Sequence, residues 1–301
     1  MLHVITPGWS TRVVDLGRPR TRSLGVPLGG AADRASLILG NGLVGNPENT
    51  AALEVSAVGP TLRAETELAC VVCGAPFELT STRQKNLRTG VTFTIEEGEE
   101  VRVAGTPRGL RAYFCVRGGF QTRAILDSRS SLEMLTAGTM LACETARIGH
   151  RFLPPGVFAT WNDAGPLRIV AGLQAASFNM AEFLGQEYAV SAKSDRMGLR
   201  IEAKPLMFEP AEMTSEPVCP GAVQVTRDGQ CIILGVDGQT IGGYPKIAHV
   251  VDADLDRLGQ LRPGQRLRFA QVDLAEALTL GRQRNEQLAE WMLRLQVSLS
   301  Y

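Results

Sequence analysis

The sequence has few aromatic residues, no net charge and no long apolar run. It contains 31 Lys+Arg and 31 Asp+Glu in 301 residues, which argues against nucleic-acid binding through a strongly basic surface. Its apolar runs, such as Cys231–Val236, are far shorter than the roughly 18 residues of a membrane span. No basic segment followed by an apolar stretch opens the chain, so no signal peptide is expected. We therefore expect a soluble, cytoplasmic protein that binds neither nucleic acid nor membrane.

Common phosphate, metal and hydrolase signatures are also missing. There is no Walker-type phosphate loop, no H-E-x-x-H, no G-x-S-x-G and no G-x-G-x-x-G. Cys70 and Cys73 have the spacing of a zinc or redox pair, but no second pair exists and both fall in an apolar run. This setting favours buried thiols. We predict no metal site, and any nucleotide chemistry must use a less familiar arrangement.

Glycine and proline divide the chain into many short segments with strand character. The 32 Gly and 16 Pro are scattered rather than repeated. Residues 92–95 alternate polar and apolar, 96–99 form a turn, and the alternation resumes to 103, which predicts a β-hairpin. Many short strands at this spacing indicate barrels or sandwiches. The predicted strands are Leu68–Val72, Val91–Ile95, Val101–Ala104, Arg111–Val116, Leu167–Ala171, Ala222–Val225, Cys231–Val236, His249–Val251 and Arg266–Phe269.

Helical signals are few. Asp33 is a candidate N-cap for a helix over Arg34–Leu43. Apolar residues recur near one face across Asp273–Leu295, which predicts a C-terminal helix packed on a barrel, with Gly281 as a candidate break.

The chain is predicted to divide near its middle. Proline- and glycine-rich segments at 154–156 and 163–166 separate two strand-rich halves that echo one another weakly. We predict two domains, 1–165 and 166–301, with the boundary somewhere within 155–200. Two related β-barrels from an old duplication would explain the echo.

The richest candidate site follows the apolar strand at 231–236. The segment from Asp237 to Lys246 combines two adjacent glycines with polar side chains, and Gln224 precedes it. Gly242 and Gly243 allow close approach of a ligand, while Lys246 offers a point charge suited to a phosphate, a carboxylate or a developing oxyanion. The alternative is a glycine-rich turn with a solvated lysine.

Two other clusters combine glycines with charged side chains. In the first, Gly29 and Gly30 follow Arg18, which could hold a carboxylate or phosphate, while Asp33 could equally cap a helix. The second contains Asp195 and Arg196, which spacing alone makes structural more often than catalytic.

Ordered motifs run through nearly the whole chain. They are Ser10-Thr11, Asp15-Leu16-Gly17-Arg18-Pro19, Gly25-Val26-Pro27, Gly30-Ala31, Asp33, Leu43-Val44-Gly45-Asn46-Pro47, Leu53-Glu54, Gly59-Pro60, Ser128-Arg129-Ser130, Ser194-Asp195-Arg196-Met197-Gly198 and Asp237-Gly238-Gln239-Thr240-Ile241-Gly242-Gly243-Tyr244-Pro245. With these motifs the sequence resembles the allophanate hydrolase subunit 2 family, also described as biotin-dependent carboxyltransferase-like proteins or the C component of bacterial 5-oxoprolinase. Asp127 stands where the family usually has glycine.

The resemblance implies a mainly β fold with two cyclophilin-like β-barrel domains, a few short helices and a C-terminal helix. It also implies a subunit 1-like partner (the B component) and a third, barrel-type protein (the A component). The leading hypothesis is the C component of an ATP-dependent 5-oxoprolinase complex, which converts 5-oxoproline, ATP and water to glutamate, ADP and phosphate. ATP, with magnesium, would act at the level of the complex.

Under this hypothesis the site residues stabilise charge on the oxygen of an activated cyclic amide. The predicted catalytic residues are Lys246, Gln239, Asp237 and Arg196. The predicted substrate- or nucleotide-binding residues are Arg18, Gly29, Gly30, Asp33, Gln224, Gly242, Gly243 and Tyr244.

Two alternatives keep the family but change the role. The first is carboxyl transfer in a urea carboxylase-like system, with carboxybiotin arriving on a separate carrier because this chain has no Met-Lys-Met attachment sequence. The second is a non-enzymatic partner that regulates the subunit 1-like protein. His249 is expected to be a core histidine rather than a general base, and the roles of Arg129 and Asp195 stay open.

Overall fold

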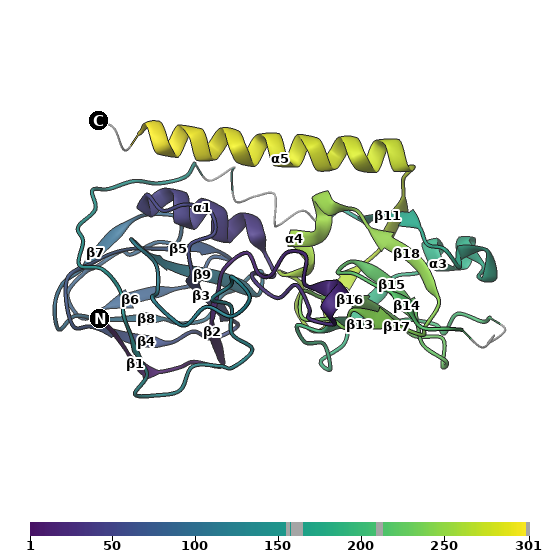
Figure 1. The fold of residues 1–301 in the computed structure, drawn as a ribbon, viewed down its shortest axis with the longest axis horizontal. Coiled ribbons are helices and arrows are strands. Elements are labelled where there is room, and N and C mark those ends of the chain that lie inside the picture. Colours follow the sequence, from purple (N-terminus) through teal and green to yellow (C-terminus); the bar gives the residue numbers. More distant parts are fainter. Residues whose placement is uncertain (155–156, 158–164, 209–212, 299–301) are drawn as a thin grey trace. The chain divides into compact units, whose positions relative to one another are not determined.

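The computed structural model describes residues 1–154, 157, 165–208 and 213–298. The chain forms two compact units (Figure 1). Unit 1 comprises Met1–Arg18, Gly29–Asn162 and Gln287–Tyr301, and unit 2 comprises Pro19–Leu28 and Asp163–Glu286. The main segments divide between Asn162 and Asp163; the sequence predicts domains 1–165 and 166–301 with a boundary within 155–200. That prediction did not include two short segments. Pro19–Leu28 lies in the first half of the chain but belongs to unit 2, and Gln287–Tyr301 lies in the second half but belongs to unit 1.

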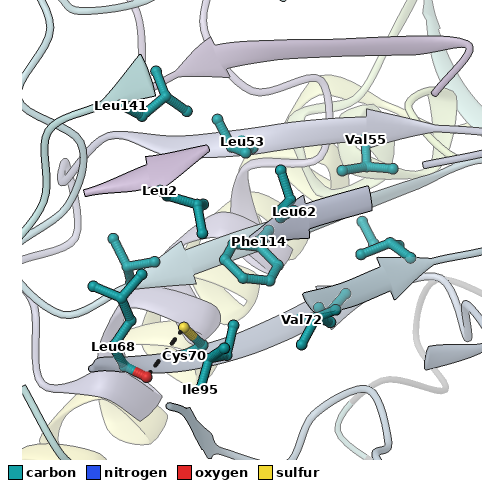
Figure 2. Packing of buried hydrophobic residues seen from close by; sticks show 14 of the residues in the cluster. Leu2, Leu53, Val55, Leu62, Leu68, Cys70, Val72, Ile95, Phe114 and Leu141 are labelled. Atoms are coloured by element: carbon teal, nitrogen blue, oxygen red, sulfur yellow. Dashed lines mark hydrogen bonds between the residues drawn. The ribbon is translucent and has the colours of Figure 1, made fainter. Parts of the chain in front are cut away.

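Unit 1 is built from two antiparallel sheets of five strands each, in the orders β10-β1-β4-β8-β6 and β2-β3-β9-β5-β7. Apolar side chains from both sheets meet in one core, and Figure 2 shows Leu62 of the first sheet close to Phe114 of the second. The mainly β fold class is thereby confirmed. The strands are β1 (Leu2–Thr6), β2 (Ser10–Val14), β3 (Ala52–Ser56), β4 (Thr61–Ala64), β5 (Leu68–Gly74), β6 (Leu79–Ser81), β7 (Phe93–Ile95), β8 (Glu100–Val103), β9 (Arg111–Val116) and β10 (Met140–Leu141).

The predicted hairpin over residues 92–103 is wrong in its pairing. Strand β7 pairs with β5, whereas β8 pairs with β4 and β6 in the other sheet. The alternation itself is confirmed, because Phe93, Ile95, Val101 and Val103 all belong to the same core. The two strands face each other across that core instead of lying side by side, and the turn at 96–99 carries the chain between the sheets.

Strand β5 is buried along its whole length because both of its faces are covered. Cys70 belongs to the core between the sheets, whereas Cys73 belongs to a second cluster under the helix α1 (Arg34–Val44). Alternate residues of a strand point to opposite faces, so these two thiols cannot share a metal ion. Cys70 donates a weak hydrogen bond to the carbonyl of Leu68 at 3.5 Å (Figure 2). The expectation that both are core thiols is confirmed.

Helix α1 is buried at every position from Ala35 to Val44, which explains why its sequence is apolar almost all round. Asp33 caps it as predicted, since its carboxylate accepts the Ser36 backbone N–H at 3.0 Å. On the sheet side, a Cβ at Gly40 would lie 2.9 Å from Cys73 Cβ and 2.7 Å from Cys115 Sγ. Glycine is therefore what lets the helix approach the sheet this closely.

The other side of α1 is covered by the last turns of α5 (Leu274–Val297). Met292 and Leu295 of α5 are buried, and a Cβ at Gly42 would lie 2.7 Å from Met292 Sδ. Gly281 does not interrupt this helix, so the candidate break at that position is wrong. Within the described residues, no helix combines the length and apolar character needed to span a membrane.

Unit 2 contains a sheet of eight strands in the order β19-β12-β13-β16-β15-β18-β11-β20. Its first and last strands, β19 (Arg266–Leu267) and β20 (Phe269–Gln271), are consecutive in the chain and separated only by Arg268. The two ends of the sheet are thus joined covalently, and the sheet is a nearly closed barrel. The predicted single strand Arg266–Phe269 is wrong, because the chain passes from one end of the sheet to the other within it.

Aromatic rings pack together where the barrel closes. Phe183, Tyr188 and Phe269 have ring centroids 4.9 to 5.8 Å apart. The remaining elements of unit 2 are η1 (Arg22–Leu24), β11 (Leu167–Ala171), η3 (Ala175–Ser177), α3 (Met180–Gly185), β12 (Tyr188–Val190), β13 (Gly198–Glu202), β14 (Glu216–Pro217), β15 (Ala222–Val225), β16 (Cys231–Leu234), β17 (Ile241–Gly242), β18 (Lys246–Val250), η4 (Asp252–Asp254) and α4 (Leu255–Leu258).

The packing of α1 gives a first prediction. We expect Gly40→Ala to lower the free energy of unfolding by about 1–3 kcal/mol, because the new methyl group meets atoms close to the β5 backbone. Gly42→Ala is the matched control: the flexible end of Met292 can move aside, and alanine favours the helix by about 1 kcal/mol. Urea denaturation measures both. Equal stability of the two variants would contradict this account of the helix–sheet distance.

Candidate functional site

A two-stranded ribbon organises the segment that follows β16. Strand β17 pairs with β14, and the register places Glu216 opposite Gly242. The ribbon therefore brings a carboxylate from residues 216–217 to the glycine-rich segment that the sequence singled out. Strand β18 then begins at Lys246, three residues earlier than the sequence predicted.

Lys246 is a buried lysine that is held by one carboxylate. Its side chain is 10% exposed, and its Nζ donates a hydrogen bond to Glu216, whose side chain is 38% exposed. Gln174 connects the same groups, since its Oε1 accepts the Lys246 backbone N–H at 3.0 Å and its Nε2 lies 3.4 Å from Glu216 Oε2. The hydrogen bond from Lys246 holds the pKa of Glu216 below its ordinary value. Glu216 is therefore ionised at neutral pH.

Two side-chain amides converge on Gly242. Gln224 lies on β15 directly opposite Lys246 and is only 1% exposed. A Cβ at Gly242 would lie 2.6 Å from Gln224 Nε2 and 2.9 Å from Gln239 Nε2. Among the described residues, Gln224 Nε2 has no hydrogen-bond partner. An unused buried donor costs stability, and it therefore marks a position where a ligand acceptor would be favourable.

We call this group the lysine–amide cluster; its members are Gln174, Glu216, Gln224, Gln239, Gly242 and Lys246. It offers an ammonium group and two amide N–H donors against a single carboxylate. Such a set of groups suits a ligand that presents carbonyl or carboxylate oxygens. Gln224, Gln239, Gly242 and Lys246 were predicted from the sequence, and the structure brings them together.

Arg196 and Asp237 form an ion pair of their own. Arg196 Nε lies 2.7 Å from Asp237 Oδ2 and a second guanidinium nitrogen lies 3.0 Å from Oδ1, with both side chains nearly buried. The Asp195 carboxylate accepts hydrogen bonds from the backbone N–H groups of Met197 and Gly198, which shapes the loop before β13. The ion pair fixes Asp237, which lies two residues before Gln239 in the chain.

Gly243 and Tyr244 lie at the exposed end of the same segment. A Cβ at Gly243 would have its nearest neighbour, Ser215 Oγ, at 3.5 Å, which is an ordinary contact. Tyr244 is 38% exposed. Close approach within the cluster therefore depends on Gly242 and not on Gly243.

The first-half motifs meet around a buried carboxylate in unit 1. Asp15 is 2% exposed, and its Oδ1 accepts the hydroxyls of Ser128 and Ser130, each at 2.6 Å. The backbone N–H groups of Gly17 and Arg129 also donate to this carboxylate, at 2.8 and 2.6 Å. Two motifs more than a hundred residues apart are thus joined by one side chain. We call this arrangement the Asp15 junction, and it gives both motifs a structural role.

The predicted binding residues of the first half lie at this junction. Arg18 donates to the carbonyls of Ile125 and Ser130 at 3.0 and 2.6 Å. A Cβ at Gly30 would lie 2.6 Å from Gly17 N, and Gly29 and Gly30 both have positive φ. The carboxylate of Asp33 accepts hydrogen bonds from the backbone N–H and the hydroxyl of Ser36 at the start of α1. These contacts stabilise the loop, and we do not include its residues in the lysine–amide cluster.

Asp127 and Arg129 flank Ser128, one of the residues that bond Asp15. Asp127 has φ +60°, in the region that favours glycine and that aspartate tolerates better than most residues. This explains how aspartate can stand where the family usually has glycine. Arg129 donates to the carbonyl of Thr122, so its side chain fixes the same loop.

Sequence reasoning missed Glu216 and Gln174. Strand β14 has only two residues, too few for an alternation to be visible, and Gln174 lies in a turn before η3. The need of Lys246 for an acid follows from its burial, which the sequence does not show.

Comparison with known proteins identifies the family. The model of the carboxyltransferase domain, subdomain A and B, matches residues 24–271, and the chain belongs to this family. It is 34% identical to the C component of the Haemophilus influenzae 5-oxoprolinase over 299 residues, which cover 95% of this chain and 96% of that protein. It is 31% identical to the corresponding 5-oxoprolinase component of Escherichia coli, covering 92% and 93% of the two chains. The family resemblance stated from the sequence is confirmed.

Solved structures agree on the fold. The urea amidolyase of Kluyveromyces lactis matches with a TM-score of 0.87 at 23% identity, covering 96% of this chain and 20% of that one. At this identity the match speaks for the fold alone. Another solved structure matches with a TM-score of 0.81 at 32% identity. The match covers 89% of this chain and 56% of that one.

The junction around Asp15 gives a second prediction. We expect Asp15→Asn to lower the free energy of unfolding by about 1–3 kcal/mol. Both carboxylate oxygens of Asp15 accept hydrogen bonds, so the NH₂ group of asparagine would face at least one hydrogen-bond donor in place of an acceptor. Asp127→Asn, at an exposed position of the same loop, is the matched control and should change stability little. Urea denaturation decides. A neutral Asp15→Asn would mean that the junction does not need the charge.

Proposed function

We propose that this chain is the C component of an ATP-dependent 5-oxoprolinase-type complex that opens 5-oxoproline to glutamate. The observation that carries the proposal is the end-to-end similarity to two such components of bacterial 5-oxoprolinases, in which this chain spans 96% and 93% of their length. The urea amidolyase relatives are matched over only 17% of theirs. We propose that the chain acts together with a subunit 1-like protein (the B component) and a barrel-type protein (the A component).

The lysine–amide cluster fits a cyclic amide that carries a carboxylate. The lactam carbonyl is a poor electrophile because of amide resonance, and ATP supplies the activation by phosphoryl transfer to the substrate. The amide nitrogens of Gln224 and Gln239 can donate to a substrate oxygen held against Gly242. Lys246, which is itself buried, adds a positive charge that can stabilise negative charge on a substrate oxygen.

ATP and its magnesium ion are assigned to the complex, and no residue of this chain is assigned to hold them. Within the described part of the chain, no group of three or more His, Cys, Asp or Glu side chains lies close enough to hold a metal ion. The lysine–amide cluster holds a single carboxylate, Glu216, already engaged by Lys246. Its chemistry suits the substrate better than a metal-bound nucleotide.

Reconstitution tests the proposed reaction. The chain is mixed with its A- and B-component partners, and ATP-dependent release of glutamate from 5-oxoproline is measured with and without it. Turnover that disappears when the chain is omitted supports the proposal. A stable complex without turnover argues against it.

Lys246 gives the third prediction. We expect Lys246→Met in the reconstituted complex to reduce kcat by about 10²–10³-fold, because the charge that stabilises the developing oxyanion is removed. Lys204→Met is the control, since Lys204 is 78% exposed and forms a salt bridge with Glu182. Thermal unfolding of both variants shows whether folding is intact. Wild-type turnover of Lys246→Met would remove this residue from the site.

Gly242 gives the fourth prediction. Gly242→Ala places a methyl group against both amide nitrogens and should raise KM or lower kcat by at least about tenfold, while Gly243→Ala should leave both near wild type. Steady-state kinetics with 5-oxoproline compares the two. If both alanines behave alike, the amides of Gln224 and Gln239 do not contact the substrate.

A second candidate is carboxyl transfer from carboxybiotin on a separate carrier. The family model, which is that of a carboxyltransferase domain, favours it. A base would take a proton from the acceptor while the site excludes water. Release of carbon dioxide or carboxylation of urea-like acceptors in the presence of carboxybiotin, without 5-oxoproline turnover, would select this reaction.

A further inference from the structure

An exposed thiol in unit 2 lies against an imidazole. Cys219 stands between β14 and β15, and its Sγ lies 3.1 Å from His249 Nε2. His249 belongs to β18, and the pairing of β15 with β18 sets it opposite Ala222. Neither residue belongs to the lysine–amide cluster.

The ring of His249 is held in one orientation. Its Nδ1 lies 2.9 Å from the carbonyl oxygen of Val250, so Nδ1–H donates there and Nε2 faces the sulfur. Gly221 has φ +90°, and a Cβ at this position would lie 3.1 Å from His249 Cε1. The loop that carries Cys219 therefore wraps closely over the ring, and the thiol–imidazole contact is a built feature of the fold.

Charged groups around the sulfur favour its ionised form. The hydrogen bond with His249 lowers the pKa of Cys219 most strongly, partial burial opposes it, and the charges of His249 and Arg22 lower it further. Asp252 on η4 acts in the opposite direction. Burial is the largest single influence on His249 and lowers its pKa, but Cys219, Val250 and Asp252 together outweigh it and raise it.

Arg22 is fixed beside this loop. One of its guanidinium nitrogens donates to the carbonyls of Val218 and Gln239, and the distance to the latter is 3.0 Å. Its positive charge thus lies against the residue that precedes Cys219 in the chain. The described titratable groups acting on the thiol are His249 on β18, Arg22 on η1 and Asp252 on η4.

The other cysteines have the opposite environment. Cys70, Cys73, Cys115 and Cys231 are buried, and burial raises the pKa of each, that of Cys231 to about 12. The pKa of the half-buried Cys143 is also raised by burial. Thiolates, not thiols, attack disulfides, so these five cysteines serve as internal references for Cys219.

We propose that Cys219 is a modification site for small-molecule disulfides, activated by His249. The thiol proton moves from Sγ to His249 Nε2, and the thiolate attacks one sulfur of the disulfide. A new S–S bond forms to Cys219, the original S–S bond breaks, and the leaving thiolate takes up one proton. The net change is one thiol and one disulfide giving one mixed disulfide and one free thiol. This site does not depend on the reaction proposed above.

Glutathione disulfide is the probe that tests the proposal. The full chain is incubated with it between pH 5.5 and 9, and peptide mass spectrometry follows the adduct at each cysteine. We expect Cys219 to be modified at least about tenfold faster than Cys143 at pH 7, with a rate midpoint below the value of about 8.5 for an ordinary thiol. A midpoint at or above the ordinary value, or modification of Cys143 at an equal rate, would overturn the proposal.

Substitution of the imidazole separates activation from simple exposure. His249→Gln should slow modification of Cys219 about tenfold at pH 6.5 and move its midpoint up toward the ordinary value, whereas the control His150→Gln should change neither. An unchanged rate and midpoint in a folded His249→Gln variant would contradict the role of His249.

A second measurement keeps the test valid if His249→Gln does not fold. Cys219→Ser changes an exposed side chain, and we expect the pKa of His249, followed by NMR of its Cε1–H, to fall because the anionic partner is lost. The signal is assigned by elimination with His3→Gln and His150→Gln, since the chain has three histidines. No change in the His249 pKa would overturn the proposed activation of Cys219 by His249.

Discussion

The candidate site depends on the need of a buried ammonium group for an anion. Lys246 is nearly inaccessible to solvent, and a charge in that position requires a partner and further hydrogen bonds. Glu216 supplies the charge and Gln174 bonds to both residues. Glu216 reaches the lysine because β14 pairs with β17, and that pairing also orders the segment that carries Gln239 and Gly242. One electrostatic requirement thereby fixes the main parts of the site.

The charges of the cluster are compensated, whereas its hydrogen-bond donors are only partly used. Gln224 keeps an unused amide nitrogen at a buried position among the described residues, which is a cost that a purely structural glutamine would avoid. Arg196 and Asp237, by contrast, satisfy each other. The difference separates an ion pair whose members bond to each other from an amide that still has a donor available.

Much of the fold could be predicted from local patterns, but the site could be predicted only in part. Strands such as Arg111–Val116 and Ala222–Val225 have the bounds that alternation and apolar content indicate, and Asp33 caps its helix as expected. Alternation cannot show which strand is the neighbour, so the hairpin over 92–103 was wrong. Charged residues near glycines look alike in sequence. Only the register shows that Lys246 meets Glu216, a residue in a strand too short to be visible.

The covalent joining of β19 to β20 determines when unit 2 can be completed. Strand β11 pairs with β20 and β12 pairs with β19. Each of these early strands therefore lacks one of its two neighbouring strands until residues 266–271 are present. Contacts this distant in sequence slow folding, because a long loop must be closed first. Until residues 266–271 have been synthesised, β11 and β12 each have an unpaired edge, and unpaired edges are templates for association with other chains. The short segment that closes the barrel therefore ends a period in which the growing chain is vulnerable to aggregation.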